Sequence, residues 1–484
     1  MIISTNKKKI EKITLIEPSS AGSHIFTNYK IPRLGLPVVG AKIKEKGYKV
    51  KIYVEDIKPI DYNEAFSSDL VGISCTSSTV VRGYAIASEF KKRGIPIVMG
   101  GFHPTFMPEE SLQYCDFVVR GEGEETIAEL LDVLEGDRDI GTVDGLSFKT
   151  SEGEVINNAP RKILSSLDDS PLPDFTLIDG YEKINIFPLS TSRGCPFDCQ
   201  FCTVTNFYGR SYRTKSIDRV MKEFANVKAN YIFICDDNFA ANRARTKELL
   251  ERKEKEGNKV MWGAQVRIET ADDTELLERM HRTNCSNVYI GFESINPETI
   301  KTFNKKLDLN KIKRQIKAFH RYGIKIHGMF VLGADSDTSA TIKETLKFTK
   351  RTHIDTVQFM ILTPIPGSKI FNDFQSRNKI FTYDWRLYDG HHVVYKPERM
   401  SPFELQKAVL RATKRFYSKR RIMLRLLKFD LFTTFGRSQG YKLFRQWMKE
   451  NKKFLERIRT GLYDKIKSFD PVNSDSKDAN LTIN

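Results

Sequence analysis

The first part of the chain alternates short apolar runs with amphipathic stretches over residues 10–135. Each apolar run has the length of a strand, and each stretch between two runs has the apolar spacing of a helix. This alternation favours a doubly wound, Rossmann-like parallel sheet of the α/β class. The predicted strands are Lys12–Ile16, Lys49–Val54, Leu70–Ser74, Pro96–Met99 and Phe117–Val119.

The same alternation returns after a polar, Pro-containing stretch at residues 151–185, which is typical of a linker. Six further apolar runs and the helical stretches between them predict a partial (β/α)6 barrel of the TIM type over residues 186–370. The predicted strands are Phe187–Ser192, Tyr231–Cys235, Val260–Val266, Val288–Phe292, Lys325–Leu332 and Val357–Thr363, and the predicted helices include Ser216–Val227, Ala244–Lys255, Asp273–Thr283 and Ser339–Thr352.

A length of 484 residues is too great for one ordinary core and predicts two or three domains. We expect a ligand-binding domain at 10–150, the barrel, a mostly helical extension at 371–467 and a disordered polar tail at 468–484. No apolar run reaches the roughly 18 residues of a membrane span, and we find no cleavable leader, so the sequence predicts a cytoplasmic protein. Seven cysteines, an odd number, do not indicate a disulfide framework.

The formal net charge of +17 is concentrated near the C-terminus. Residues 411–467 hold 18 Lys and Arg against 4 Asp and Glu, interleaved with aromatic residues. Three interpretations stay open. The segment is a helical lid with a solvated basic face, a peripheral element at the inner face of a membrane, or a nucleic-acid-binding segment, in decreasing order of preference.

Cys195, Cys199 and Cys202 form a CxxxCxxC motif that supplies three thiolates and no fourth. A structural zinc site or a closed iron–sulfur cluster takes four protein ligands. Three thiolates suit an iron–sulfur cluster with one iron left open to a ligand that is not protein. The alternative is a zinc site whose fourth ligand comes from far along the chain; its candidates are His103, His327 and Cys235.

This spacing, on a loop directly after an apolar strand, resembles the radical S-adenosylmethionine (SAM) superfamily. The resemblance implies that the three cysteines hold a 4Fe-4S cluster whose open iron binds SAM, and that Phe201 lies near the adenine. Polar residues at the carboxyl ends of later barrel strands match SAM-binding elements of that family. The residues implied to hold SAM are Asp236, Asp237, Gln265, Arg267 and Glu293, with backbone at Leu362 and Thr363 facing the adenine.

Short loops follow the strands of the first region, where a doubly wound sheet binds its ligand. They resemble the cobalamin-binding domain fused to many radical SAM enzymes, and their glycines let the backbone approach a flat ligand closely. No Asp-x-His-x-x-Gly motif follows the first strand, which implies a corrin without a histidine ligand from that loop. The residues implied to contact cobalamin are Ser74, Thr76, Gly100, Gly101, His103, Gly121, Glu122 and Gly123.

Residues 383–402 resemble the C-terminal extension of a subgroup that includes the hopanoid C-2 methylases. This resemblance implies that one SAM methylates reduced cobalamin, a second yields the deoxyadenosyl radical, and the substrate radical receives the methyl group. It implies a C-methyltransferase for an unactivated carbon of a small-molecule or lipid substrate, apolar and of the hopanoid kind, with flavodoxin or ferredoxin as reductant. The alternatives are a cyclase or oxidoreductase of the same architecture, an RNA-modifying radical enzyme, and a non-catalytic metal-stabilised binding protein.

Overall fold

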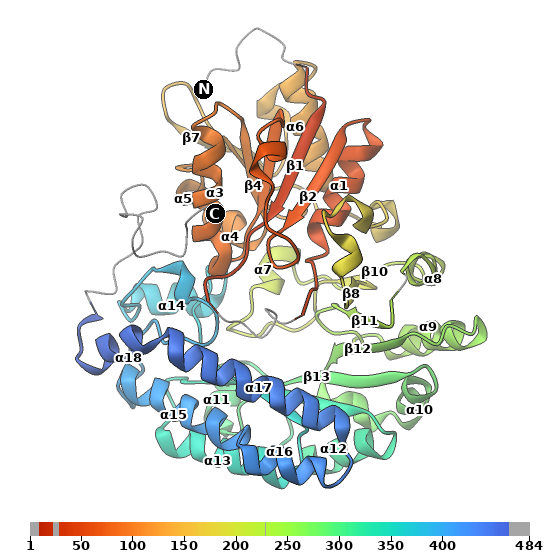
Figure 1. Cartoon of the computed structure of the whole chain (residues 1–484), viewed down its shortest axis with the longest axis vertical. Coiled ribbons are helices and arrows are strands. Elements are labelled where there is room, and N and C mark those ends of the chain that lie inside the picture. Colours follow the sequence, from red (N-terminus) through yellow and green to blue (C-terminus); the bar gives the residue numbers. More distant parts are fainter. Residues whose placement is uncertain (1–8, 23–28, 228, 464–484) are drawn as a thin grey trace.

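The computed structural model describes residues 9–22, 29–227 and 229–463. The tail predicted at 468–484 lies outside the described residues. Figure 1 shows two sheets stacked along the long axis of the molecule, the N-terminal one at the top and the second below it. One continuous cluster of buried apolar side chains runs from Ile16 in the first sheet to Ile458 near the C-terminus, so the two halves share a core.

The first sheet has the strand order β2-β1-β3-β4-β5-β6-β7. Its first five strands are parallel and most of their residues are buried, as expected of a sheet covered on both faces by helices. This confirms the predicted doubly wound domain. The strands are β1 (Lys12–Glu17), β2 (Lys49–Val54), β3 (Leu70–Ser74), β4 (Ile97–Gly100) and β5 (Phe117–Val119), with α1 (Gly35–Glu45), α2 (Tyr62–Ala65), α3 (Ser77–Lys91), α4 (Phe102–Phe106), α5 (Pro108–Ser111) and α6 (Glu124–Glu135).

Two antiparallel strands that the sequence pattern did not predict extend this sheet. They are β6 (Leu146–Lys149) and β7 (Val155–Asn157). The turn between them passes through Gly153 at a φ of 87°, a left-handed conformation that glycine adopts without strain. The segment assigned to a linker at 151–185 therefore begins as an edge strand of the first sheet.

The second sheet has six parallel strands in chain order, β8-β11-β12-β13-β14-β15. Neighbouring strands are joined by helices on the outer face, which confirms the predicted partial (β/α)6 barrel. The strands are β8 (Phe187–Leu189), β11 (Tyr231–Ile234), β12 (Met261–Val266), β13 (Cys285–Glu293), β14 (Lys325–Leu332) and β15 (Thr356–Ile361), and the helices are α8 (Ile217–Asn226), α9 (Arg243–Lys255), α10 (Thr274–Arg282), α11 (Pro297–Thr302), α12 (Ile312–Arg321) and α13 (Ser339–Arg351).

Helices of the C-terminal region cover the open edge of the barrel at β15, and α17 crosses it as the long helix of Figure 1. An uncovered edge strand leaves backbone N–H groups without partners. Here Val357 N donates to the Tyr417 hydroxyl at 3.0 Å. No helix in the described ranges is long and apolar enough to cross a membrane. The helices are α14 (Lys369–Ser376), α15 (Pro402–Phe416), α16 (Lys419–Leu426), α17 (Leu431–Glu450) and α18 (Lys452–Arg459).

Candidate active site between the two sheets

The cysteine loop follows β8 and the short strand β9 (Ser192–Arg193), at the carboxyl end of the barrel. Its backbone is tied to two later parts of the barrel, because Gln200 N donates to Phe303 O at 3.2 Å and Ile370 N donates to Gln200 O at 3.1 Å. Gly194 enters the loop at a φ of 86°, and a Cβ there would overlap the carbonyl oxygen of Ser211. This position therefore requires glycine.

The three thiols of the loop are partly buried. Burial raises the pKa of Cys202 to about 12 and also raises the pKa values of Cys195 and Cys199. The nearby cations Lys305 and Arg267 act in the opposite direction on Cys199. Iron binds the thiolate form of cysteine, so assembly of a cluster at this loop would release protons from the three thiols. The positive charge of the iron would then stabilise the thiolates, which burial alone disfavours. In the part of the chain that is described, no three His, Cys, Asp or Glu side chains are arranged to hold a bare metal ion.

Each candidate for a fourth zinc ligand has another partner. Cys235 Sγ donates to the carbonyl oxygen of Leu189 at 3.3 Å, and His327 Nδ1 is hydrogen-bonded to the Thr356 hydroxyl at 2.9 Å. His103 is hydrogen-bonded at both ring nitrogens to residues of helices α3 and α5. The contacts of Cys235 and His103 argue against a zinc site completed by either of them, whereas the contact of His327 occupies only one of its two ring nitrogens.

Asp236, at the end of β11, holds the segment that leads into the cysteine loop. Its carboxylate accepts four hydrogen bonds, from the backbone N–H groups and the hydroxyls of Thr191 and Ser192, at 2.6 to 3.2 Å. Only 1% of Asp236 is exposed. A carboxylate with this many donors is committed to positioning the loop, so the structure turns Asp236 away from the role in SAM binding that the sequence implied.

Its neighbour Asp237 accepts a hydrogen bond from the backbone of Gly194, which directly precedes Cys195. Burial and the charge of Asp236 raise the pKa of Asp237 to about 6, while the backbone N–H of Gly194 partly offsets the rise. The charge of Asp237 also raises the pKa values of Cys195 and Cys202. It is the carboxylate of the pair that remains available to a ligand.

The charges of Arg267 and Glu293 also act on the cysteine loop, at Cys199. The Arg267 guanidinium stands 4.1 Å from the ring centroid of Phe197 within the loop and is paired with Glu269 at 3.0 Å. Glu293 ends β13 at a left-handed φ of 61° and is paired with Lys305 at 3.1 Å. A residue other than glycine in this conformation is strained, and such strain clusters at ligand sites. The sequence did not predict Lys305, which lies twelve positions after Glu293, beyond helix α11, and carries no local signal of this contact.

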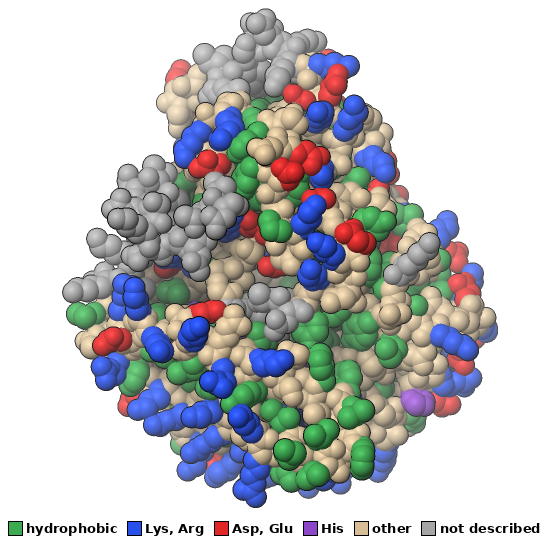
Figure 2. All heavy atoms as spheres, in the orientation of Figure 1, with side chains coloured by type: hydrophobic (Ala, Val, Ile, Leu, Met, Phe, Trp, Pro, Cys, Tyr) green, Lys and Arg blue, Asp and Glu red, His purple; other side chains and the backbone are tan. Residues whose placement is uncertain are grey.

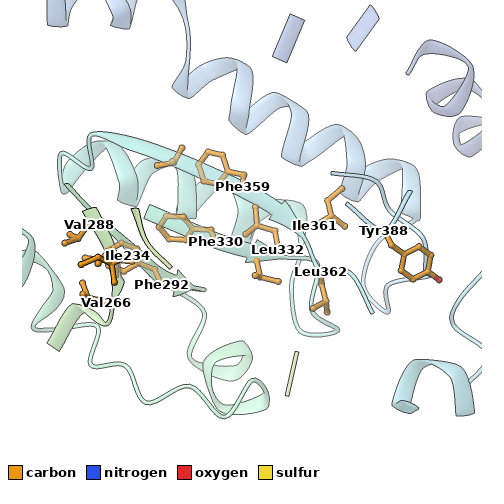
Figure 3. Close-up of a cluster of buried hydrophobic side chains, with 14 of the residues drawn as sticks. Ile234, Val266, Val288, Phe292, Phe330, Leu332, Phe359, Ile361, Leu362 and Tyr388 are labelled. Atoms are coloured by element: carbon orange, nitrogen blue, oxygen red, sulfur yellow. The ribbon is translucent and has the colours of Figure 1, made fainter. Parts of the chain in front are cut away.

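The remaining residues assigned to SAM occupy supporting positions. Phe201 packs edge-on against Phe303 with 5.1 Å between ring centroids. Leu362 is buried in the apolar cluster drawn in Figure 3, and its backbone N–H donates to Leu332 O at 2.9 Å, so a ligand contact by its backbone stays a prediction for the carbonyl group alone. The Thr363 hydroxyl donates to Ile361 O at 3.0 Å. Gln265 lies on β12, beside Tyr289 of β13.

The loops assigned to cobalamin meet at the carboxyl end of the first sheet. Ser74 and Gly100 are paired in register, and Thr76 begins α3 with a capping box. A Cβ on Gly101 would stand 2.7 Å from the carbonyl oxygen of Cys75, whereas a Cβ on Gly121 would meet no atom within 4 Å. The backbone at Gly121 is therefore open to a bulky flat ligand, which fits a corrin.

His103 is not directed into this open region. Its Nδ1 is hydrogen-bonded to Ser77 at 3.0 Å and its Nε2 to Glu110 at 3.3 Å, and 1% of the residue is exposed. Trp385 of the C-terminal region donates to the same Glu110 carboxylate at 2.8 Å. This network joins the first sheet to the C-terminal region and leaves no ring nitrogen of His103 free.

Glu122 pairs with the barrel instead of facing the open region. Arg193 reaches Glu122 at 2.7 Å and Glu124 at 2.5 Å, and Arg213 reaches Glu122 at 3.0 Å. Burial alone would raise the pKa of Glu122, but the hydrogen bonds from Arg213 and Arg193 outweigh it and lower the pKa. We call Glu122, Glu124, Arg193 and Arg213 the charge clamp. It joins the loop after β5 to the residue that stands two positions before Cys195, and the sequence did not predict it.

Comparisons with known proteins agree with this geometry. The family described as the radical SAM superfamily matches residues 189–349, and the B12 binding domain matches residues 27–131. An uncharacterized methyltransferase of Pyrococcus horikoshii is 31% identical over 88% of this chain and 96% of its own length. The chain belongs to the cobalamin-binding radical SAM family.

Other relatives of this radical SAM enzyme are named for reactions that differ from one another, methylation in two cases and cyclisation in a third. A bacteriochlorophyllide d C-8(2)-methyltransferase of Chlorobaculum tepidum is 30% identical over 74% of this chain and 80% of its own length. A hopanoid C-3 methylase of Methylococcus capsulatus is 26% identical over 81% of this chain and 77% of its own length. An anaerobic magnesium-protoporphyrin IX monomethyl ester cyclase of Rubrivivax gelatinosus is 26% identical over 84% of this chain and 77% of its own length.

The fold of the enzyme is also found in a solved structure. The cobalamin-dependent SAM radical enzyme OxsB, with aqua-cobalamin and SAM bound, matches 98% of this chain and 83% of its own with a TM-score of 0.66. The identity is 15%, so this likeness concerns the fold alone. The cofactors of this radical SAM enzyme are a 4Fe-4S cluster, SAM and cobalamin, as the sequence implied.

We expect Asp236→Asn to weaken retention of the cluster by about 10- to 100-fold, the usual effect of losing a residue that orients metal ligands. Asparagine keeps the shape but offers one acceptor oxygen, so Thr191 and Ser192 lose part of their hydrogen bonding. Iron and sulfide content after anaerobic reconstitution and gel filtration measures the effect. Asp308→Asn, at an exposed carboxylate, is the control, and equal iron content in the two variants would contradict the positioning role.

Proposed function

We propose that this radical SAM enzyme is a cobalamin-dependent methyltransferase that acts on an unactivated carbon of an apolar substrate. The observation that carries the proposal is the charge clamp. It holds the loop that carries Gly121, beside the open corrin region, against the segment that carries Cys195. Methyl transfer to a substrate radical needs both cofactors close to one carbon atom, and a buried ionic contact between their two loops supports such closeness.

We assign roles to the residues as follows. Cys195, Cys199 and Cys202 would hold the cluster, which when bound supplies the electron that cleaves SAM. Asp237, Arg267 and the Glu293–Lys305 pair supply charged groups around the cysteine loop, where they orient the amino, carboxylate and ribose groups of SAM. Ser74, Thr76, Gly100, Gly101, Gly121 and Gly123 would form the cobalamin surface.

Aromatic side chains between the two domains support the proposal of an apolar substrate. Phe102 of α4 stacks on Phe207 of α7 (Val204–Tyr208) with 4.3 Å between ring centroids, and Phe106 lies 6.3 Å from the same ring. Aromatic surface of this kind suits a flat polycyclic substrate. A hopanoid or another polycyclic or isoprenoid lipid belongs to this class. We also propose a cytoplasmic location, a reductant such as flavodoxin or ferredoxin, and peripheral contact with the inner face of the membrane.

A cyclisation or oxidation without methyl transfer is the second candidate. It is favoured by the relative that is a magnesium-protoporphyrin IX monomethyl ester cyclase. The mass of the product separates the two reactions, because methylation adds one carbon whereas cyclisation or oxidation removes hydrogen.

Anaerobic reconstitution with cobalamin and SAM labelled in its methyl group, followed by mass analysis of a lipid extract, tests the proposal. We expect the label in an apolar product, and none with Cys199→Ala. Deoxyadenosine formed together with an unlabelled product of lower mass would favour the second candidate.

We expect Gly121→Ala to lower cobalamin affinity by at least about tenfold, since a buried steric conflict of more than roughly 1.4 kcal/mol corresponds to that factor. Gly153→Ala is a matched control. Both glycines have a left-handed φ and no atom within 4 Å of an added Cβ, so both substitutions carry the same backbone strain. Absorbance of cobalamin retained after gel filtration measures the difference. Equal retention by the two variants would remove Gly121 from the corrin surface.

A further inference from the structure

The corner between α16 and α17 exposes a dense group of large apolar side chains. Among the described residues thirteen large hydrophobic residues are exposed, and eight of them lie between residues 423 and 435. Phe429 at the turn is 88% exposed. Figure 2 shows green side chains gathered at the lower end of the molecule, where Figure 1 places α16 and one end of α17. We call Met423, Leu424, Leu426, Leu427, Phe429, Leu431, Phe432 and Phe435 the apolar corner.

The apolar corner stands on a fixed base. Arg437 of α17 is 1% exposed and donates to the carbonyl oxygens of Asp355 at 2.8 Å and Ile354 at 3.1 Å. Asp430, which begins α17, pairs with Lys325 of the barrel at 3.3 Å. Phe429 itself has a left-handed φ of 54°, a strained conformation for a bulky residue. The base thus holds the phenyl ring outward, and such strain is a sign of function.

A basic hollow of about 910 Å³ adjoins the apolar corner and shares Leu424 with it. In the described chain none of its six cations forms an ion pair with an acidic residue. Arg421 Nε is buried without a hydrogen-bond partner. Burial and the charges of Arg421 and Arg415 lower the pKa of Lys350, as expected where like charges crowd together. The cations of the basic hollow are Lys350, Arg411, Lys414, Arg415, Arg420 and Arg421.

We propose that the apolar corner and the basic hollow together dock this enzyme on an anionic phospholipid membrane. Lipid phosphates are held in the basic hollow while the apolar corner enters the headgroup region, the arrangement by which peripheral proteins bind anionic bilayers. A nucleic acid would use the cations but leave Leu427 and Leu431 exposed. A second copy of the chain would bring two basic surfaces together. The docking surface rests on the peripheral membrane contact proposed above and assigns residues to it, but it does not depend on methyl transfer. It would give the enzyme direct access to a lipid substrate.

Flotation of the full-length protein with lipid vesicles tests the docking surface. Vesicles of phosphatidylcholine alone are compared with vesicles that also contain phosphatidylglycerol, and we expect at least about tenfold tighter binding to the latter. The triple variant Leu427→Gln, Phe429→Gln, Leu431→Gln is expected to weaken binding to anionic vesicles by at least about tenfold, because it removes the apolar contact. The double variant Arg415→Gln, Arg420→Gln is expected to lower the affinity for anionic vesicles by roughly fivefold for each cation removed.

Met261→Gln is the matched control, since Met261 is 48% exposed at the start of β12, and it should float like the unaltered protein. Melting temperatures verify that every variant is folded. Unchanged flotation of the triple variant would overturn the proposal, as would equal binding to both kinds of vesicle. Release by inorganic phosphate but not by sodium chloride of the same ionic strength would identify a free-phosphate site, because both salts screen charge equally. RNA binding that is insensitive to the triple variant would identify an RNA site, and either outcome overturns membrane docking. Flotation measures binding and requires no catalytic turnover. Failure of membrane docking can therefore be distinguished from failure of methyl transfer.

Discussion

Replacing Cys199 by alanine is expected to reduce SAM cleavage by at least about 1,000-fold, which corresponds to roughly 4 kcal/mol in the activation free energy. The other two thiols cannot retain a 4Fe-4S cluster that offers one open iron, because two of its irons would then lack a protein ligand. Lys305 and Arg267 both act against the rise in the pKa of Cys199, and Lys305 acts in the same direction on Cys195. Deoxyadenosine formed under anaerobic reducing conditions measures the effect.

Cys285→Ala is the control for this substitution. Cys285 is a buried thiol at the start of β13, outside the motif, and its loss should leave iron content and deoxyadenosine formation within about twofold. Retention of a full cluster and of SAM cleavage by Cys199→Ala would refute the assignment of the open-iron site.

Arg193→Met is expected to destabilise the protein by about 3 to 5 kcal/mol, the usual cost of removing one partner from a buried ion pair. The substitution leaves Glu122 and Glu124 with 6% exposed side chains and without their shared cation. Because the charge clamp joins the two cofactor loops, the variant is also expected to lose cobalamin and to form deoxyadenosine in excess over methylated product. Denaturant unfolding, cobalamin retention and the product ratio measure the three effects.

A double-mutant cycle separates the charge clamp from general damage. Glu122→Gln combined with Arg193→Met should be less destabilising than the sum of the single variants, by about 0.5 to 3 kcal/mol. Arg210→Met, at a 70% exposed surface pair with Asp198, should cost no more than about 1 kcal/mol. Strict additivity in the cycle, together with an unchanged product ratio, would contradict coupling between the two loops.

Much of the architecture was predictable because it depends on local patterns. Predicted strands such as Lys49–Val54, Leu70–Ser74 and Lys325–Leu332 have the observed bounds, since continuous apolar runs between turn residues are a signal confined to a few positions. The pair β6 and β7 was missed because both strands are short, and β7 is half exposed, so the apolar run is weak. The C-terminal helices were expected, whereas the exposure of the apolar corner depends on which faces the barrel covers.

The candidate site divides in the same way. Gly101 and Gly121 have a left-handed φ in loops that follow strands, and Asp237, Arg267 and Glu293 lie at or just after strand ends, whereas their ligand roles stay predictions. Asp236 and Asp237 are adjacent identical residues. No local pattern indicates which of them accepts hydrogen bonds from Thr191 and which accepts one from the backbone of Gly194. His103 was implied as a cofactor contact, but its partners Ser77 and Glu110 occupy both ring nitrogens.

The sequence by itself determined the two kinds of α/β unit, the positions of most of their strands along the chain and the three thiolates with no fourth, because periodicity and motif spacing are properties of neighbouring residues. The tertiary structure alone decided that Arg193 meets Glu122, which stands 71 positions earlier, and that Lys305 meets Glu293 at the cysteine loop. It also decided that eight apolar side chains beside α16 remain exposed. Such pairings depend on how separate elements pack, and packing is decided by the burial of the whole chain.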